Sequence, residues 1–437
     1  MTKQLIFIGI VLISAGIFTY SIRNIFSNIA FLKKAYPVKD FGKRFKMLLN
    51  IGFGQTKILR FPLIGFLHAL VFWGFLAILF GSGEMLIDGI FGFEKSLKIL
   101  GPLYQFFMIS GDIAGLVILV LILVFLFRRF FLHIKRFSGV EMTHKAHKDA
   151  TFALLLILLL MISLLGMNIG YVNLNPTESQ FYPASNLLAP FFQPENEYFN
   201  HILEQFNWWA HIILIFFFAN YLPYSKHFHV FMSLPNVFFS KLTPLTQMSN
   251  MERVTDEVKL MMDPNAAFAE APPEEEAIER FGMKDIEDGT WKHYIDSLTC
   301  TQCGRCTSAC PANLTGKLLS PRKLLIDFRS RMNEKSPGLR NDINYTDNKS
   351  LLDNSISREE IWACTTCNAC AQECPVNIDH PSIILELRRY LFMEESAAPS
   401  ALNTMSTNIE NNGAPWQYPP TDRLKWADDL FINDEKA

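Results

Sequence analysis

Eight cysteines, all in the last third of the chain, form two groups with the same spacing. The groups are Cys300, Cys303, Cys306 and Cys310, then Cys364, Cys367, Cys370 and Cys374. A proline follows the last cysteine of each group, at Pro311 and Pro375. Cysteines that cluster in this way indicate metal ligation rather than disulfides, and therefore a reducing compartment.

The spacing itself identifies the expected metal site. Both groups follow the pattern C-x2-C-x2-C-x3-C-P, the run that binds two [4Fe–4S] clusters in bacterial ferredoxins, where the fourth cysteine ligates the other cluster. We therefore predict that one cluster is held by Cys300, Cys303, Cys306 and Cys374. The other is predicted on Cys364, Cys367, Cys370 and Cys310. Zinc is the alternative, because C-x2-C pairs also bind Zn²⁺, but zinc does not require this run twice with a trailing proline.

The segment between the two groups gives the fold of this region. The 53 residues from Pro311 to Ala363 are too many for a compact β-type bacterial ferredoxin. Helical spacing is predicted in Ser320–Arg331, Ser357–Ile361 and Ile383–Glu394. The region resembles the α-helical ferredoxin of succinate dehydrogenase iron–sulfur subunits and heterodisulfide reductase subunits.

Short motifs around the cysteines carry a more specific resemblance. They are Phe281-Gly282, Thr290-Trp291-Lys292, Thr315-Gly316-Lys317, Leu319-Ser320-Pro321, Trp362-Ala363 and Leu387-Arg388. Over roughly Glu279–Tyr390, these motifs are similar to the iron–sulfur part of membrane-bound heterodisulfide-reductase-like oxidoreductases. Those enzymes place their substrate chemistry in a domain with paired CCG motifs, and no cysteine follows Cys374. The resemblance therefore implies a cytoplasmic partner subunit of the CCG type or a flavoprotein.

The C-terminal tail gives two equal alternatives. Residues 413–426 are similar to the segment that leads into the CCG domain in single-chain relatives, so this tail is predicted to help dock the partner. The composition from Glu395 onward, rich in Ser, Asn and Pro, is equally consistent with a tail that has no core of its own.

Five apolar stretches are each long enough to cross a bilayer, which takes about 20 residues. The membrane helices that they form must position the cysteine motifs. The stretches are Leu5–Ile25, Leu59–Phe80, Phe106–Phe127, Thr151–Ile169 and Trp208–Pro223. Lys and Arg are frequent between stretches one and two and between stretches three and four, but absent from Tyr171 to Asn207. The positive-inside rule then places the N-terminus outside and the cysteines in the cytoplasm, in the cytoplasmic (inner) membrane.

Three histidines in or near the apolar stretches are candidate ligands, because histidine is rare and costly inside a bilayer. His68 lies in the second stretch, His211 near the outer start of the fifth and His229 near its inner end. Five spans with these histidines resemble the cytochrome b (gamma) subunit of respiratory nitrate reductases, and residues 221–229 are similar to that family's closing motif. The resemblance implies haem b, in one or two copies.

The sequence departs from that family at one position, because Ile78 stands where the family's second histidine on this span is needed. We expect His68 and His229 to bind one haem near the cytoplasmic face. Three alternatives stay open, namely His68 with His211, His211 with His201 or a methionine, and His227 in place of His229. A quinone site is expected beside His68 and His229, with Arg60 and Lys226 as contacts.

Composition limits the remaining function classes. A net charge of −2 without a basic stripe disfavours a nucleic-acid partner. No nucleotide-binding glycine motif and no catalytic dyad is found, so no catalytic residues are predicted. The expected function is electron transfer between membrane (mena)quinone, haem b, two [4Fe–4S] clusters and a cytoplasmic partner. The alternative is a membrane-tethered ferredoxin that acts as an anchor or redox sensor without quinone turnover.

The predicted architecture is all-α, a five-helix transmembrane bundle followed by a cytoplasmic α-helical ferredoxin domain. The predicted bounds are 1–232 for the bundle, 233–278 for a linker, 279–394 for the ferredoxin domain and 395–437 for the polar tail.

Overall fold

The computed structural model describes residues 2–263 and 280–428, and within these ranges the chain forms helices and two isolated β-bridges but no strand. The all-α prediction is confirmed for this part of the chain. Residues 264–279 of the predicted linker and 429–437 of the predicted tail lie outside the described residues.

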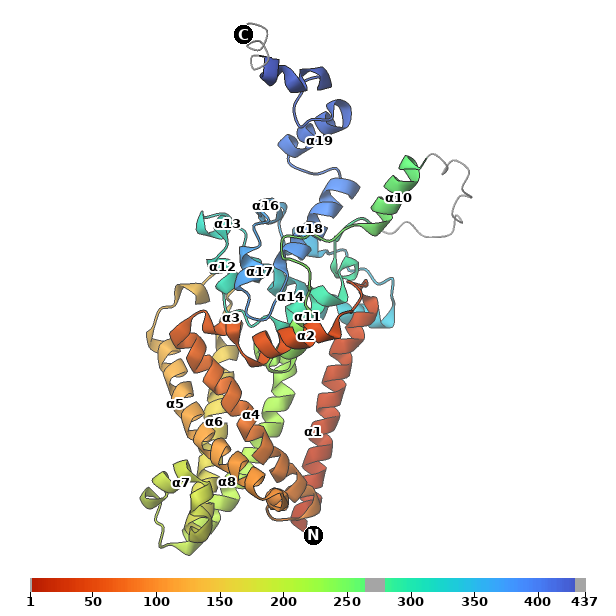
Figure 1. The fold of residues 1–437 in the computed structure, drawn as a ribbon. Helices are drawn as coiled ribbons and strands as arrows, with labels where there is room; N and C mark the ends of the chain where they lie inside the picture. Colours follow the sequence, from red (N-terminus) through yellow and green to blue (C-terminus); the bar gives the residue numbers. More distant parts are fainter. Residues whose placement is uncertain (1, 264–279, 429–437) are drawn as a thin grey trace, which may run out of the picture.

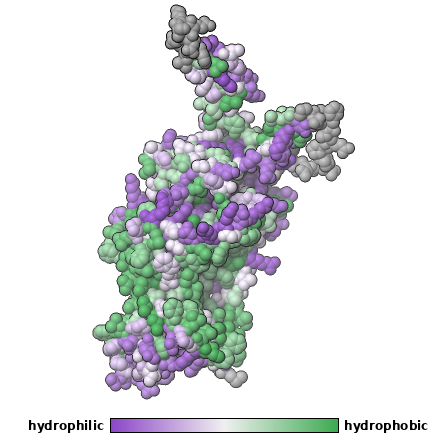
Figure 2. Space-filling view, in the orientation of Figure 1, coloured by the Kyte–Doolittle hydropathy of each residue, from purple (hydrophilic) through white to green (hydrophobic). Residues whose placement is uncertain are grey.

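Five helices are long and apolar enough to cross a membrane, which confirms the five predicted spans. They are α1 (Thr2–Ser27), α4 (Pro62–Phe91), α5 (Pro102–Phe131), α6 (His144–Leu174) and α8 (Glu197–Tyr221). Each helix runs beyond its apolar stretch, and prolines open α4 and α5, where a missing N–H costs no helical hydrogen bond. Helices α4, α5, α6 and α8 pack in sequence, and α1 packs on α4 and α8 (Figure 1). Their outward faces form an apolar belt between two polar zones (Figure 2).

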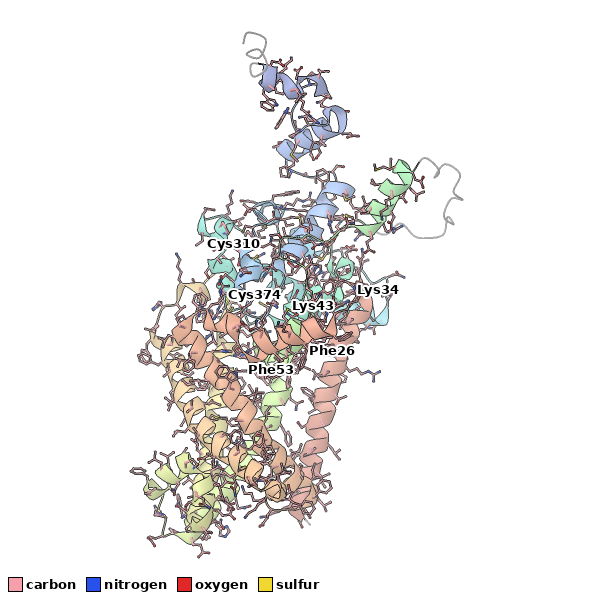
Figure 3. All side chains as sticks on the ribbon, viewed as in Figure 1. Phe26, Lys34, Lys43, Phe53, Cys310 and Cys374 are labelled. Carbon is pink, nitrogen blue, oxygen red and sulfur yellow. The ribbon has the colours of Figure 1, made fainter. Side chains whose placement is uncertain are left out.

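A short helical segment crosses the end of the bundle between α1 and α4. It consists of α2 (Phe41–Met47), η2 (Leu48–Phe53) and α3 (Thr56–Leu59). Exposed apolar side chains recur along it at Phe41, Phe45, Leu49 and Phe53, with Lys43 and Lys46 between them. Figure 3 shows Phe26 and Phe53 at the level where the spans end and Lys34 and Lys43 nearer the cysteines. This pattern is typical of a helix that lies in the membrane surface.

The cysteine-bearing domain is a cluster of short helices around one longer helix. Its elements are α11 (Trp291–Thr299), α12 (Arg305–Ser308), α13 (Pro311–Leu314), α14 (Pro321–Asn341), α15 (Leu351–Asn354), α16 (Arg358–Trp362), α17 (Ala369–Glu373), α18 (His380–Arg389) and η11 (Tyr390–Glu394). The three predicted helical stretches are confirmed in α14, α16 and α18–η11.

The core of this domain continues into the end of the membrane bundle. Leu324, Leu325 and Phe328 of α14 are fully buried, and they belong to the same apolar core as Phe228 and Met232, which follow α8. Met232 lies in α9 (His229–Phe238), so the stretch predicted as a linker begins inside a packed helix. The two parts of the chain therefore meet through a shared core.

Three elements lie at the edge of or outside this body, namely α10 (Glu252–Met262), α19 (Ser400–Asn412) and η12 (Pro420–Ala427). Helix α19 and η12 extend away from the bundle (Figure 1). The stretch that contains them exposes Trp416, Tyr418, Leu424 and Trp426. The described part of the tail is therefore helical, with large apolar side chains on its surface.

Candidate functional site

The two cysteine motifs share a backbone path as well as a spacing. Gln302 and Thr366, at equivalent places, have φ of 58° and 52°, and Gly304 and Asn368 have φ of 75° and 60°. Left-handed residues in such a turn point successive N–H groups toward one side, which makes the concavity found at anion and Fe–S sites. Gly304 is needed for a second reason, because a Cβ there would lie 2.3 Å from the carbonyl oxygen of Arg136.

Backbone N–H groups also reach the sulfurs. Thr366 N–H donates to Cys364 Sγ at 3.3 Å, and Ile378 N–H donates to Cys374 Sγ at 3.4 Å. Hydrogen bonds of this kind tune the reduction potential of an iron–sulfur centre.

The fourth cysteine of each motif lies beside the other motif, where α12 packs against α17. Burial, and then the charges of Cys303 and Cys300, raise the pKa of Cys374 to about 12. Burial also raises the pKa of Cys364, and the charge of Cys310 adds to that shift. Cys374 therefore lies within electrostatic reach of the first motif, and Cys310 lies within reach of the second.

The thiols of the two motifs differ in their exposure. All eight are free, and five of them are buried, namely Cys300, Cys306, Cys310, Cys370 and Cys374. Across residues 2–263 and 280–428, no three Cys, His, Asp or Glu side chains converge closely enough to hold one metal ion.

Cationic side chains surround the sulfurs, which favours thiolates in a buried site. Arg388 lies 5.0 Å from the centre of the Trp362 ring and donates to the carbonyls of Ile361 and Cys364. On the other side, Lys57 from the membrane-surface segment donates to the carbonyl of Cys374 at 3.2 Å.

Of the three histidine candidates, the structure brings two together. His68 on α4 lies within electrostatic reach of His229, at the start of α9. His229 Nδ1–H donates to the carbonyl of Lys226 at 3.4 Å, which leaves Nε2 available. Metal-bound histidines commonly donate their second N–H to a carbonyl in this way, so His229 fits a haem ligand. His227 lies beside it, with 5.8 Å between the ring centroids, and its Nδ1 faces Ser225 Oγ at 3.1 Å.

His211 is buried elsewhere in the bundle, against α6. Its Nδ1 lies 3.0 Å from the carbonyl oxygen of Leu160 and 2.9 Å from Ser163 Oγ. Among the described residues, its Nε2 has no hydrogen-bond partner.

A residue that the sequence analysis did not single out joins the two sites. Arg305 stands between Cys303 and Cys306, and it is within electrostatic reach of Cys303, Cys374 and His68. Its Nη1 donates to the carbonyl of Lys57 at 3.1 Å. The signal available in the sequence was a cation inside the first motif, where the second motif has Ala369.

A buried ion pair fixes the cysteine domain on the bundle. Arg322 of α14 lies 2.7 Å from Glu141, which stands between α5 and α6, and both side chains are almost fully buried. Arg322 also donates to the carbonyls of Arg136 and Ser138.

The two cations expected at a quinone site are engaged in other contacts. Arg60 lies 2.8 Å from the carboxylate of Glu373, and Lys226 donates to the carbonyl of Ala146 at 2.7 Å. Both therefore act as links between elements in this structure.

The cysteine motifs match a known protein family. Residues 292–375 match the family described as the 4Fe-4S dicluster domain, and this range contains both motifs. This chain carries a 4Fe-4S dicluster domain. The match supports two [4Fe–4S] clusters, as predicted.

Similarity to curated proteins extends into the membrane part. The chain is 28% identical to the "Probable iron-sulfur-binding oxidoreductase FadF" of Bacillus subtilis, over 98% of this chain and 61% of that protein. It is 29% identical to the "EtfAB:quinone oxidoreductase" of Syntrophomonas wolfei, over 87% of this chain and 53% of that protein. A 32% identity to a "Probable membrane-anchored ferredoxin" of Chromohalobacter salexigens covers 35% of this chain and 25% of that protein.

The homologues are iron–sulfur oxidoreductases, and they include heterodisulfide reductase subunits. The chain spans between about half and three fifths of the length of the first two relatives. No solved structure matches the chain.

Proposed function

We propose that this chain is the electron-transfer subunit of a membrane-bound, quinone-linked oxidoreductase complex. The observation that carries the proposal is the position of Arg305, which lies within electrostatic reach of Cys303 and Cys374 on one side and His68 on the other. One-electron centres held at these residues would be neighbours, as a chain of electron carriers requires.

The roles of the side chains follow from their placement. His68 and His229 would hold one haem b, which supplies one-electron chemistry at the end of the bundle. Cys300, Cys303, Cys306 and Cys374 would hold one cluster, and Cys364, Cys367, Cys370 and Cys310 the other. The residues around them position these carriers and set their potentials, while the redox chemistry belongs to the cofactors.

The partner is proposed to be a cytoplasmic subunit of the CCG type or a flavoprotein. The Syntrophomonas wolfei relative, whose name pairs EtfAB with quinone, supports both ends of the proposed path. In the proposed orientation the N-terminus is outside and the cysteines are in the cytoplasm, because Lys and Arg gather on the cysteine-bearing side. The exposed aromatic tail, with Trp416 and Trp426, would dock the partner. Truncation after Glu395 should then abolish co-purification of the partner, and unchanged co-purification would refute this docking role.

A second candidate function is a membrane-tethered ferredoxin without quinone turnover. The similarity to the membrane-anchored ferredoxin of Chromohalobacter salexigens favours it. Quantifying cofactors in the anaerobically purified chain separates the two functions. The proposal predicts about eight irons and one haem b per chain, with the haem visible in a reduced-minus-oxidised spectrum. Eight irons without haem would favour the tethered ferredoxin.

A further inference from the structure

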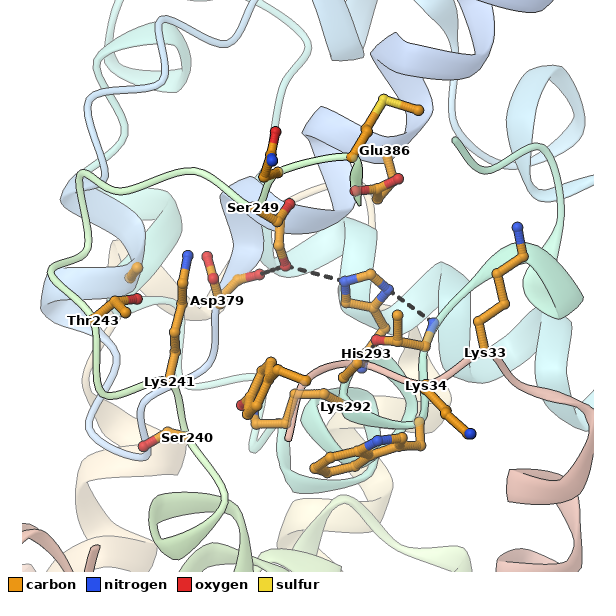
Figure 4. A pocket seen from close by; sticks show the side chains of 18 of the residues that line it. Lys33, Lys34, Ser240, Lys241, Thr243, Ser249, Lys292, His293, Asp379 and Glu386 are labelled. Carbon is orange, nitrogen blue, oxygen red and sulfur yellow. Dashed lines mark hydrogen bonds between the residues drawn. The ribbon is translucent and has the colours of Figure 1, made fainter. Parts of the chain in front are cut away.

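A cavity of about 940 Å³ lies between the cysteine domain and two segments that leave the membrane (Figure 4). One segment follows α1 and includes Lys33 and Tyr36, and the other follows α9 and includes Ser240 and Lys241. The first segment is held to the cysteine domain by backbone hydrogen bonds, from Lys33 N–H to the carbonyl of Gly289 and from Trp291 N–H to the carbonyl of Lys33. The cavity is therefore built from well-connected elements.

One wall of the cavity adjoins a predicted cluster ligand. Asn377 and Ile378 line the cavity, and Ile378 N–H is the donor to Cys374 Sγ. A molecule in the cavity would be separated from the cluster on Cys374 by little more than this loop, a short distance for electron transfer.

Another wall reaches the membrane surface. Ile51 of η2 and Lys57 of α3 line the cavity, and both belong to the amphipathic segment at the end of the bundle. Aromatic rings also lie in this region. The ring centroid of Trp291 is 5.9 Å from that of Tyr36 and 5.9 Å from that of Phe239. The cavity thus combines the rings of Tyr36 and Trp291 with charged groups such as Lys241 and Lys292, beside the segment expected at the membrane surface.

The cavity also contains groups that can exchange protons. His293 Nδ1 accepts from Thr290 N–H, so Nε2 carries the proton and donates to Ser382 Oγ at 3.1 Å. Ser382 donates in turn to the main-chain carbonyl of Asp379 at 2.7 Å. The Asp379 carboxylate lines the same cavity, where the backbone N–H of Ser382 and the charges of Lys241 and Lys292 also act on it. Burial, and then the charge of Asp296, raise the pKa of Asp379, so this carboxyl more readily carries a proton.

We propose that this cavity binds the ring of a quinone and that Asp379 passes protons to and from it. The inference rests on the proposed function, and it moves the quinone site from the histidines to the cysteine domain. A cluster held by Cys300, Cys303, Cys306 and Cys374 would supply the two electrons for quinone reduction, one at a time. Asp379 delivers two protons in turn, recharged from the aqueous side, so that each carbonyl oxygen gains one O–H bond and quinol leaves. The proposed cytoplasmic partner would supply these electrons, and quinol oxidation would run the same steps in reverse.

Photolabelling locates the site directly. The full-length chain, purified in detergent, is irradiated with a photoreactive azidoquinone that has a short isoprenoid tail, and labelled peptides are identified by mass spectrometry. Label in residues 33–37, 290–293 or 377–389, suppressed by excess unlabelled short-chain menaquinone, is expected. Label in peptides that contain His68 or His229 would overturn the cavity assignment while leaving the proposed function intact. If the reduced chain neither takes up label nor reduces quinone, the proposed function fails as well.

A pair of variants tests the proton role. Asp379→Asn should slow quinone reduction about tenfold to a hundredfold, with the iron and haem contents unchanged. Asp256→Asn is the matched control, because Asp256 is an exposed carboxylate on α10 that pairs with Lys259. A wild-type rate in Asp379→Asn would refute the role of Asp379.

Discussion

The guanidinium of Arg305 lies over the ring of Phe61, with 4.5 Å between its central carbon and the ring centroid. Phe61 immediately precedes the second membrane helix, and Arg305 stands between two predicted cluster ligands. A cation–π contact of this kind contributes about 0.5–2 kcal/mol. It also fixes one positive charge at the boundary between the iron–sulfur domain and the membrane bundle.

Replacing Arg305 should therefore change redox potentials before it changes stability. Arg305→Gln removes a charge that favours the more negative, reduced state of nearby centres, so the potential of the cluster on Cys300 should fall, on the order of tens of millivolts. EPR-monitored redox titration measures this shift. Arg305→Lys should retain most of the wild-type potential, and Arg423→Gln in the tail should retain all of it. Equal potentials in the Gln variant and wild type would contradict the placement of this charge.

We predict that the fourth cysteine of each motif ligates the cluster held by the other motif, so its replacement should change the EPR signal of that other cluster. Cys374→Ser should perturb the EPR signal of the cluster on the first motif, and Cys310→Ser should perturb the signal of the cluster on the second. Assignment of the signals comes from Cys303→Ser and Cys367→Ser, which each belong to one set. If Cys374→Ser matches Cys367→Ser instead of Cys303→Ser, each cluster is held by the four cysteines of a single motif.

The two-cluster prediction, which the family match supports, could be made from the repeated spacing because the cysteines, the trailing prolines and the turn between them are local in sequence. Gln302 and Thr366 occupy equivalent places and share a left-handed backbone. This conformation was not predictable, since a left-handed backbone at a non-glycine residue leaves no clear sequence signal. The role of Arg305 was also missed, because its partner Phe61 is more than 240 residues away in the chain.

The histidine pairing makes a spectroscopic prediction. His68→Leu and His229→Leu should each abolish the haem absorption of the purified chain, because each removes one axial ligand. His211→Leu should keep it, since His211 is held by Leu160 and Ser163. The haem content of all three variants is compared with their iron content, which reports intact folding. Loss of haem in His211→Leu with retention in His229→Leu would show that the competing pairing is correct.

The length and composition of the apolar stretches were enough to predict the five spans. The boundary between the bundle and the cysteine domain was not predictable. The predicted linker started at residue 233, whereas Met232 and its helix α9 pack into the core of the cysteine domain. Long-range packing decides such a boundary, and the local sequence of α9 resembles an ordinary amphipathic stretch.

The buried pair of Glu141 and Arg322 should be a principal contributor to docking. Glu141→Gln leaves Arg322 buried without its counter-charge, and breaking such a pair costs about 3–5 kcal/mol. Thermal denaturation of the detergent-solubilised chain should show a clearly lower Tm for the cysteine domain. Asp256→Asn, which breaks an exposed pair, should cost less than about 1 kcal/mol. A Tm equal to that of wild type in Glu141→Gln would contradict this role.

The pair of Glu141 and Arg322 should also make the Tm difference between wild type and Glu141→Gln depend on pH. Burial opposes ionisation of Glu141, but the hydrogen bond from Ser320 and the charge of Arg322 outweigh it and lower the pKa of Glu141. A carboxyl with a lowered pKa stabilises the fold above its ordinary pKa of about 4.3 and loses this effect as the pH falls through the lowered value. The Tm difference between wild type and Glu141→Gln should be constant above about pH 5 and shrink in more acidic buffer. A difference that grows on acidification would contradict the assignment.

We propose that electrons pass between quinone, haem and clusters within this one chain. The most direct test mixes the anaerobic, dithionite-reduced chain, freed of excess dithionite, with a short-chain menaquinone. Haem oxidation is followed by visible absorption and cluster oxidation by freeze-quench EPR. We expect haem and both clusters to be oxidised together, with two electrons leaving per quinol formed. Clusters that stay reduced while quinone is present in excess would contradict it.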